Sequence, residues 1–183
     1  ESRHIPNTEA GHYLRQLAPG GWSSILITNQ GDRFSALGVN EFGVAAVATF
    51  NQQEPRAYVF DDNGSETELV PQTFSGNLSG DLVALEMGRF AVVWGRSFFR
   101  INETDVILET EFAPAGFRAA AMCRLPQGFV VVGGTSQGTS SDAAIFVLGD
   151  QGNVVTSFVY AGAAGGWDVA YDVACAPDGG FVV

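Results

Sequence analysis

The sequence GFVVVGG, residues 128–134, decides the fold that we predict for this chain. Its apolar residues are consecutive rather than alternating with polar ones, which indicates a strand buried on both faces. Three further runs resemble it, at residues 43–47 (GVAAV), 89–95 (RFAVVWG) and 180–183 (GFVV). The first apolar residues of the four runs stand at positions 44, 90, 129 and 181, so the interval is roughly 40 to 50 residues, which is typical of a structural repeat.

Each run belongs to a longer pattern of expected strands. In the last repeat, residues 171–176 precede the run, and the turn Pro177-Asp178-Gly179-Gly180 joins the two segments as a hairpin. In the third repeat, two further strands are expected at residues 143–148 and 153–160, separated by a turn at 149–152. The corresponding strands of the first repeat are expected at residues 57–60 and 67–70. The pattern therefore predicts four strands per repeat.

A four-stranded antiparallel sheet that is buried on both faces and repeated in this way is the unit of a β-propeller, where each blade packs between two neighbours. We predict an all-β fold, a propeller segment of about four four-stranded antiparallel blades in residues 21–183. Residues 1–20 are expected to form a leader, either with a short helix over residues 9–17 or with a strand that closes the ring. Because the sequence stops inside the expected second strand of the last blade, we expect an incomplete ring, truncated at the C-terminus.

Several motifs carry a family resemblance. They are Phe158-Val159-Tyr160-Ala161-Gly162, Trp167-Asp168-Val169-Ala170-Tyr171-Asp172-Val173, Asp178-Gly179-Gly180-Phe181-Val182-Val183 and, in the third repeat, Leu148-Gly149-Asp150-Gln151-Gly152-Asn153. This pattern resembles the repeat of secreted β-propeller proteins with Asp-Gly-Gly-Phe-Val-Val blades, and the step Val132-Gly133-Gly134 is similar to kelch repeats. The likeness is strong over residues 116–183 and weak over 21–115. It implies an extracellular or cell-surface protein used for adhesion, assembly or recognition, with no catalytic residues in the repeat.

Composition and charge exclude several classes of protein. With 46% hydrophobic and 16% charged residues the chain is globular. Its formal net charge is −11, and all nine basic residues are Arg, so phosphate backbones and anionic membrane surfaces would repel it. No apolar run approaches the roughly 20 residues of a membrane-spanning helix. We therefore expect no nucleic-acid partner and no membrane insertion.

Candidate catalytic and metal-binding groups are few. The two His residues, His4 and His12, both lie in the leader, so a His-dependent triad or a His-built zinc site inside the repeats is excluded. Asp168 and Asp172 are close enough in sequence for acid and base work, but no partner base is visible. We expect no catalytic residue, no metal and no cofactor.

Three N-x-Ser/Thr sequons are glycosylation candidates, at Asn63, Asn77 and Asn102. Asn63 and Asn102 fall near the expected turn between third and fourth strands of successive repeats, whereas Asn77 falls in a loop between blades. Glycans at such exposed turns would point into solvent. The sequons are thus consistent with an extracellular glycoprotein.

Two Trp residues are interaction candidates. Trp22 and Trp167 each follow a Gly-Gly pair, in loops that we expect on one rim of the ring. An exposed Trp is a frequent anchor for a binding partner. The alternative for both residues is packing between blades.

The two Cys residues, Cys123 and Cys175, each lie six residues before the aligned Phe, and so occupy equivalent places in the first strands of consecutive blades. Such positions are expected at or beyond the ~7 Å Cα separation that limits a disulfide. We predict two small buried thiols, with a bridge between blades as the alternative.

Together these observations indicate a non-catalytic extracellular or cell-surface protein. Its propeller would be a platform for binding protein or glycan, or for assembly with other copies or subunits into a surface structure or filament. The alternative is a propeller enzyme or small-ligand-binding domain with its site in the central channel. The small apolar residues expected on the first strands, at residues 119–123 and 173–175, favour the non-catalytic interpretation.

Overall fold

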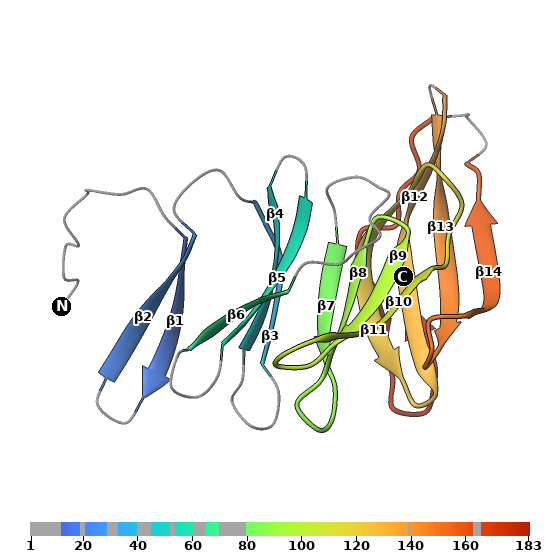
Figure 1. Ribbon diagram of the computed structural model, residues 1–183. Helices are drawn as coiled ribbons and strands as arrows, with labels where there is room; N and C mark the ends of the chain where they lie inside the picture. The colour runs from blue at the N-terminus through green and yellow to red at the C-terminus, as the bar shows by residue number, and fades with distance from the viewer. Residues whose placement is uncertain are drawn as a thin grey trace.

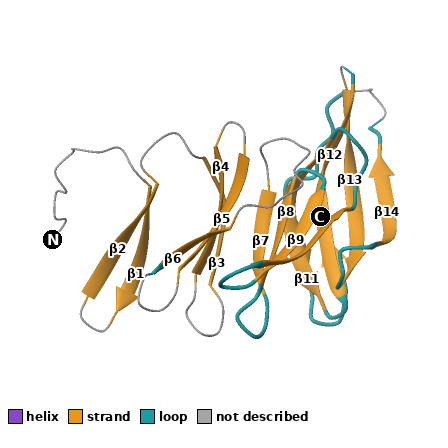
Figure 2. Ribbon diagram, in the orientation of Figure 1, coloured by secondary structure: helices purple, strands orange, loops and turns teal. Residues whose placement is uncertain are grey.

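The structure is a computed structural model, and it describes residues 12–18, 21–28, 33–39, 45–51, 54–60, 65–69, 80–138, 140–162 and 166–183. All regular elements in these ranges are β-strands (Figure 2). The all-β prediction is confirmed. In the leader, residues 12–18 form a strand, so the helix considered for that segment is wrong over these residues.

Three four-stranded antiparallel sheets form the centre of the chain, and each follows the order of the sequence. The first sheet contains β3 (Arg33–Val39), β4 (Ala45–Asn51), β5 (Glu54–Phe60) and β6 (Glu66–Leu69). The second contains β7 (Gly80–Ala84), β8 (Phe90–Trp94), β9 (Ser97–Ile101) and β10 (Val106–Glu111). The third contains β11 (Phe117–Leu125), β12 (Gly128–Gln137), β13 (Ser140–Gly149) and β14 (Val154–Tyr160).

Two smaller sheets flank this centre. β1 (His12–Ala18) pairs with β2 (Gly21–Thr28), and β15 (Ala174–Cys175) pairs with β16 (Phe181–Val182). Figure 1 shows the sheets side by side in a row, with β1 and β2 at one end and β14 at the other. The prediction of four-stranded antiparallel units is thus confirmed for three repeats, while the fourth has two strands in the described residues. None of these sheets closes on itself.

The four aligned apolar runs are the second strands β4, β8, β12 and β16. In β8 every residue is buried, and alternate side chains belong to different cores. Phe90, Val92 and Trp94 pack with residues of the first sheet, whereas Ala91 and Val93 pack with residues of the third. A strand with a core on each side needs apolar residues at consecutive positions, which explains the unbroken run.

The same arrangement recurs in β12. Phe129 and Val131 face the second sheet, whereas Val130 and Val132 face the β15–β16 side. The Phe129 ring lies 5.0 Å from the Phe98 ring of β9, measured between centroids. β12 therefore joins two neighbouring cores in the way that β8 does.

The first strands of successive sheets lie next to one another, with β3 against β7, β7 against β11 and β11 against β15. A carboxylate fixes one of these contacts, because Asp81 Oδ2 on β7 accepts a hydrogen bond from the Met122 backbone N–H on β11 (N···O 2.7 Å). The other oxygen, Oδ1, accepts from the Leu82 N–H (2.8 Å). Neighbouring sheets therefore contact one another through their first strands.

Turns between strands follow the sequence signals. The Ala176 N–H donates to the Gly180 carbonyl (2.7 Å), and Gly179 has a φ of 92°, which confirms the turn predicted at residues 177–180. In the β13–β14 turn, Gly152 has a φ of 74°, and a Cβ there would lie 2.6 Å from Cδ1 of Phe98 in the second sheet. Gly152 is therefore required both by the turn and by the packing of neighbouring sheets.

Replacement of Phe129 tests whether the sheets form one cooperative core. The Phe129→Ala variant should lose about 3–5 kcal/mol of unfolding free energy, because the side chain is completely buried between two sheets. Val155→Ala is the control in the same sheet, since Val155 is 65% exposed, and its change should stay within about 0.5 kcal/mol. Urea unfolding followed by circular dichroism measures both, and equal losses would contradict this packing.

Candidate functional site

The segment between β14 and β15 is tied to the third sheet through its backbone. Ser141 and Trp167 form a parallel bridge, in which the Asp168 N–H donates to the Ser141 carbonyl (2.7 Å). Two residues further on, the Ala170 N–H donates to the Gly133 carbonyl (3.2 Å). Trp167 and its neighbours are thus fixed along the start of β13 and along β12.

The two carboxylates of this segment accept hydrogen bonds from the backbone. Asp168 Oδ2 accepts from the Gly162 N–H (2.7 Å), and Asp172 Oδ1 accepts from the Val173 N–H (2.8 Å). Asp172 and Asp81 both lie nine residues before the aligned Phe, and both accept from the next residue along the chain. This local role of the two carboxylates is structural.

Trp167 is 69% exposed and Tyr171 is 79% exposed, and both line a hollow of about 450 Å³ that we call the aromatic hollow. Its floor and walls come from β11, β12, β13 and the 166–171 segment. The residues that line it are Arg118, Ala120, Gly134, Ser136, Ser141, Trp167, Val169 and Tyr171. The hollow combines two exposed aromatic rings with hydroxyl and guanidinium groups.

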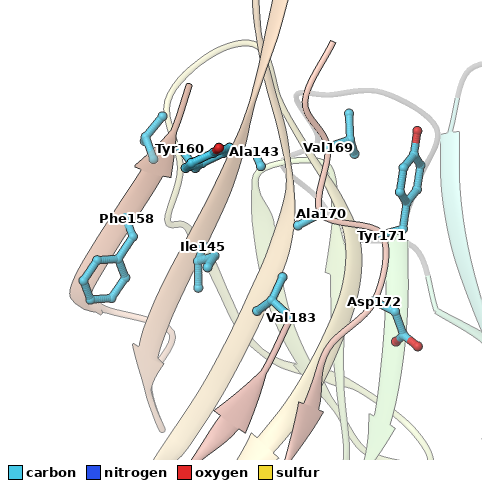
Figure 3. A pocket seen from close by; sticks show the side chains of 10 residues that line it. Ala143, Ile145, Phe158, Tyr160, Val169, Ala170, Tyr171, Asp172 and Val183 are labelled. Atoms are coloured by element: carbon cyan, nitrogen blue, oxygen red, sulfur yellow. The ribbon is translucent and has the colours of Figure 1, made fainter. Parts of the chain in front are cut away.

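A second, larger hollow lies on the outer half of the same sheet face, and we call it the apolar groove. It has a volume of about 670 Å³ and is lined by Ala143, Ile145, Phe158, Val159, Tyr160, Val169, Ala170, Tyr171, Asp172 and Val183. Figure 3 shows side chains of β13 and β14 on one side and residues 169–172 on the other. All seven residues of β14 are exposed, including Phe158 at 54% and Tyr160 at 68%. Edge strands usually carry little exposed apolar surface, and β14 differs from them in this respect.

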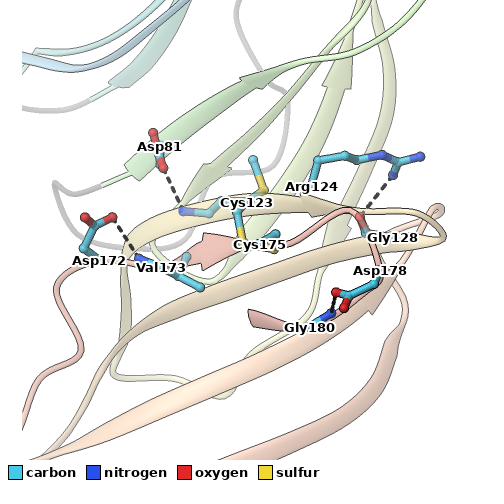
Figure 4. The surroundings of a disulfide bond; sticks show 10 residues. Asp81, Cys123, Arg124, Gly128, Asp172, Val173, Cys175, Asp178 and Gly180 are labelled. Carbon is cyan, nitrogen blue, oxygen red and sulfur yellow. Dashed lines mark hydrogen bonds between the residues drawn. A yellow bond between two sulfur atoms is a disulfide. The ribbon is translucent and has the colours of Figure 1, made fainter. Parts of the chain in front are cut away.

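Cys123 on β11 and Cys175 on β15 form a disulfide, with their Cα atoms 5.7 Å apart (Figure 4). The prediction of two separate thiols was therefore wrong. It assumed that equivalent residues of neighbouring first strands are too far apart, whereas β11 and β15 are in contact and converge at this point. The bridge joins the β15–β16 pair covalently to the third sheet.

Three arginines, Arg89, Arg100 and Arg124, lie near one another beside the β13–β14 turn. Arg124 lies 4.6 Å from the centroid of the Phe129 ring and forms an ion pair with Asp150. Burial lowers the pKa of the nearby Arg100 guanidinium, Arg89 and Arg124 lower it further, and Asp150 opposes the shift. Because Arg124 and Asp150 are both substantially exposed, their ion pair contributes little to stability.

The remaining predicted site residues lie in different parts of the chain. Trp22 is the second residue of β2, where its backbone is in register with Leu17 of β1, rather than in a loop. Asn102 lies in the β9–β10 turn, where its Oδ1 accepts from the N–H groups of Thr104 (2.9 Å) and Asp105 (2.7 Å). These bonds do not use Nδ2, the atom that would carry a glycan. Asn63, Asn77 and His4 lie outside the described residues, and His12 is the first residue of β1.

Sequence reasoning singled out Trp167 but missed Tyr171, Phe158 and Tyr160. Tyr171 was taken as part of a first strand, although β15 begins only at Ala174. The signal for Phe158 and Tyr160 was present, because VVTSFVY is apolar at neighbouring positions with no further strand predicted to cover it. Their exposure follows from the position of β14 at the edge of the third sheet.

Comparisons with known proteins identify no relative, since no family model matches the chain and no curated protein is significantly similar to it. Within the described ranges, no group of three or more His, Cys, Asp and Glu side chains is placed to hold a metal ion. The described part of the chain also has no helix long and apolar enough to cross a membrane.

Removal of the disulfide tests its contribution to the fold. The double variant Cys123→Ser/Cys175→Ser should lose about 2–4 kcal/mol of unfolding free energy, because the bridge closes a loop between residues 52 positions apart. Urea unfolding measures the loss, and a reductant should lower the stability of the parent chain but not that of the variant. Quantitative alkylation of both Cys residues before reduction would contradict the bridge.

Proposed function

We propose that this chain is a non-catalytic extracellular or cell-surface protein whose sheets are blades of a β-propeller of the secreted, kelch-like kind. It acts as a platform that binds protein or glycan, and that assembles with other copies into a larger surface structure or filament. Two features support the propeller. The second strands β8 and β12 have a core on each face, and the first strands lie next to one another along the row.

The disulfide and the sequons support the extracellular location. Disulfides form and persist in oxidising compartments and are rare in the cytosol. Cys123 and Cys175 are both partly buried beside an apolar core, as a structural bridge requires. The Asn102 sequon lies in an exposed turn, where a glycan would not disturb the sheets.

The observation that carries the assembly proposal is the apolar groove. Part of the third sheet's outer face is already covered, because Ala170 and Val173, which lead into β15, pack with Val130 and Val132 of β12. The groove continues this interface over β13 and β14, where no described strand covers it. Strands paired with β16 would extend the β15–β16 sheet over this groove.

We assign this place to the β1–β2 hairpin of a second copy. This hairpin is a two-stranded antiparallel sheet that pairs with no other described strand. Figure 1 shows it at the opposite end of the row from β14, so one copy would present the hairpin and the next would present the groove. Such a contact joins two different surfaces and therefore propagates head to tail.

Self-association tests this function. Light scattering coupled to size exclusion should show dimers and longer species that increase with concentration. The variant Phe158→Ser/Tyr160→Ser should shift the chain to monomers, because it places hydroxyl groups in the apolar groove. Ile107→Ser is the matched control, since Ile107 is 51% exposed on the edge strand β10 and lies outside the groove. A chain that stays monomeric at every concentration, or one that Ile107→Ser disrupts equally, would refute the assembly.

A further inference from the structure

We infer that the aromatic hollow binds a pyranose ring of a glycan, with Trp167 as the stacking platform. This inference rests on the proposed role as a binding platform and assigns one site of that platform. The apolar groove on β14 is the adjoining surface, and Val169 and Tyr171 line both.

The exposed rings indicate a ligand with an apolar face. Trp167 is exposed although its backbone is tied to Ser141, so the ring is presented to solvent by a fixed segment. One face of many pyranose rings carries only C–H groups, and these groups favour the negatively charged face of an aromatic ring. Tyr171 adds a second ring from the same segment, with a hydroxyl that both donates and accepts.

The polar groups of the hollow match the edge of a sugar. The polar lining residues are Ser136, the buried Ser141 and the exposed Arg118, which supply hydroxyl groups and a guanidinium. Sugar hydroxyls both donate and accept hydrogen bonds, so serine hydroxyls and a guanidinium serve them together.

Two of the residues that line the hollow are small, Gly134 and Ala120. A Cβ at Gly134 would lie 2.8 Å from Ser141 Oγ and 3.1 Å from Val169 Cγ2, so a larger residue there would displace these two side chains of the lining. The volume of about 450 Å³ lies within the range of small-ligand pockets, roughly 300–1,000 Å³. A compact hollow of this size favours one or two sugar rings over an extended proline-rich peptide, which needs a long aromatic groove.

Titration with methyl glycosides of glucose, galactose, mannose and N-acetylglucosamine tests the site. The signal is the indole N–H resonance of Trp167 in a ¹H–¹⁵N spectrum, assigned with Trp167→Phe. At least one sugar should shift this resonance saturably with a Kd of about 1 mM or below. Trp167→Ala should weaken sugar binding, measured by calorimetry, by at least about tenfold. Ala120→Leu, which places a larger side chain among the lining residues, should weaken it similarly.

Ile107→Ala is the control, because Ile107 is 51% exposed on β10 and lines neither the hollow nor the groove, and it should bind sugar as the parent chain does. The inference fails if none of the four sugars gives a saturable shift, if Ile107→Ala weakens binding as much as Trp167→Ala, or if an octaproline peptide occupies the hollow instead. Trp167→Ala should leave self-association unchanged. Failure of sugar binding with self-association intact would therefore refute this site alone, and the reverse result would refute the assembly alone.

Discussion

The burial of the second strands β8 and β12 between two neighbouring sheets is the constraint on which the rest of this structure depends. In β8 and β12, consecutive side chains enter different cores, so neither face is available to water. A sheet with two apolar faces cannot be stable alone, because one face would stay exposed. The second and third sheets therefore each require a neighbour on both sides, so their stabilities depend on the adjacent sheets.

The same constraint explains where the surface features lie. Neighbouring sheets meet along their first strands, where Asp81 bonds to β11 and the disulfide joins β11 to β15. On the third sheet the β15–β16 side covers only part of the outer face, and the apolar groove is the uncovered remainder. The aromatic hollow forms where the 166–171 segment crosses the starts of β11 and β13. Candidate sites thus arise from incomplete cover of one sheet face.

Much of the fold could be predicted from the sequence, because the spacing of the apolar runs indicates the repeat and their unbroken apolar character indicates buried strands. The runs beginning at positions 44, 90, 129 and 181 coincide with β4, β8, β12 and β16. The disulfide could not be predicted, since the distance between Cys123 and Cys175 depends on how closely the first strands converge. Trp167 was found because Gly-Gly-Trp marks a loop, but Tyr171 and Phe158 required knowledge of where β15 begins and which strand is the edge. Local patterns specify strands, whereas sites on this chain depend on the relation between sheets.

Hydrogen–deuterium exchange of the intact chain tests the central claim most directly. Exchange reports the free energy needed to open each strand. If second strands are held between two cores, the amides of β8 and β12 should exchange slowest and at a common rate, while those of the exposed edge strand β14 exchange much faster. Exchange of β8 and β12 as fast as β14, or protection of only one of the two, would contradict the account.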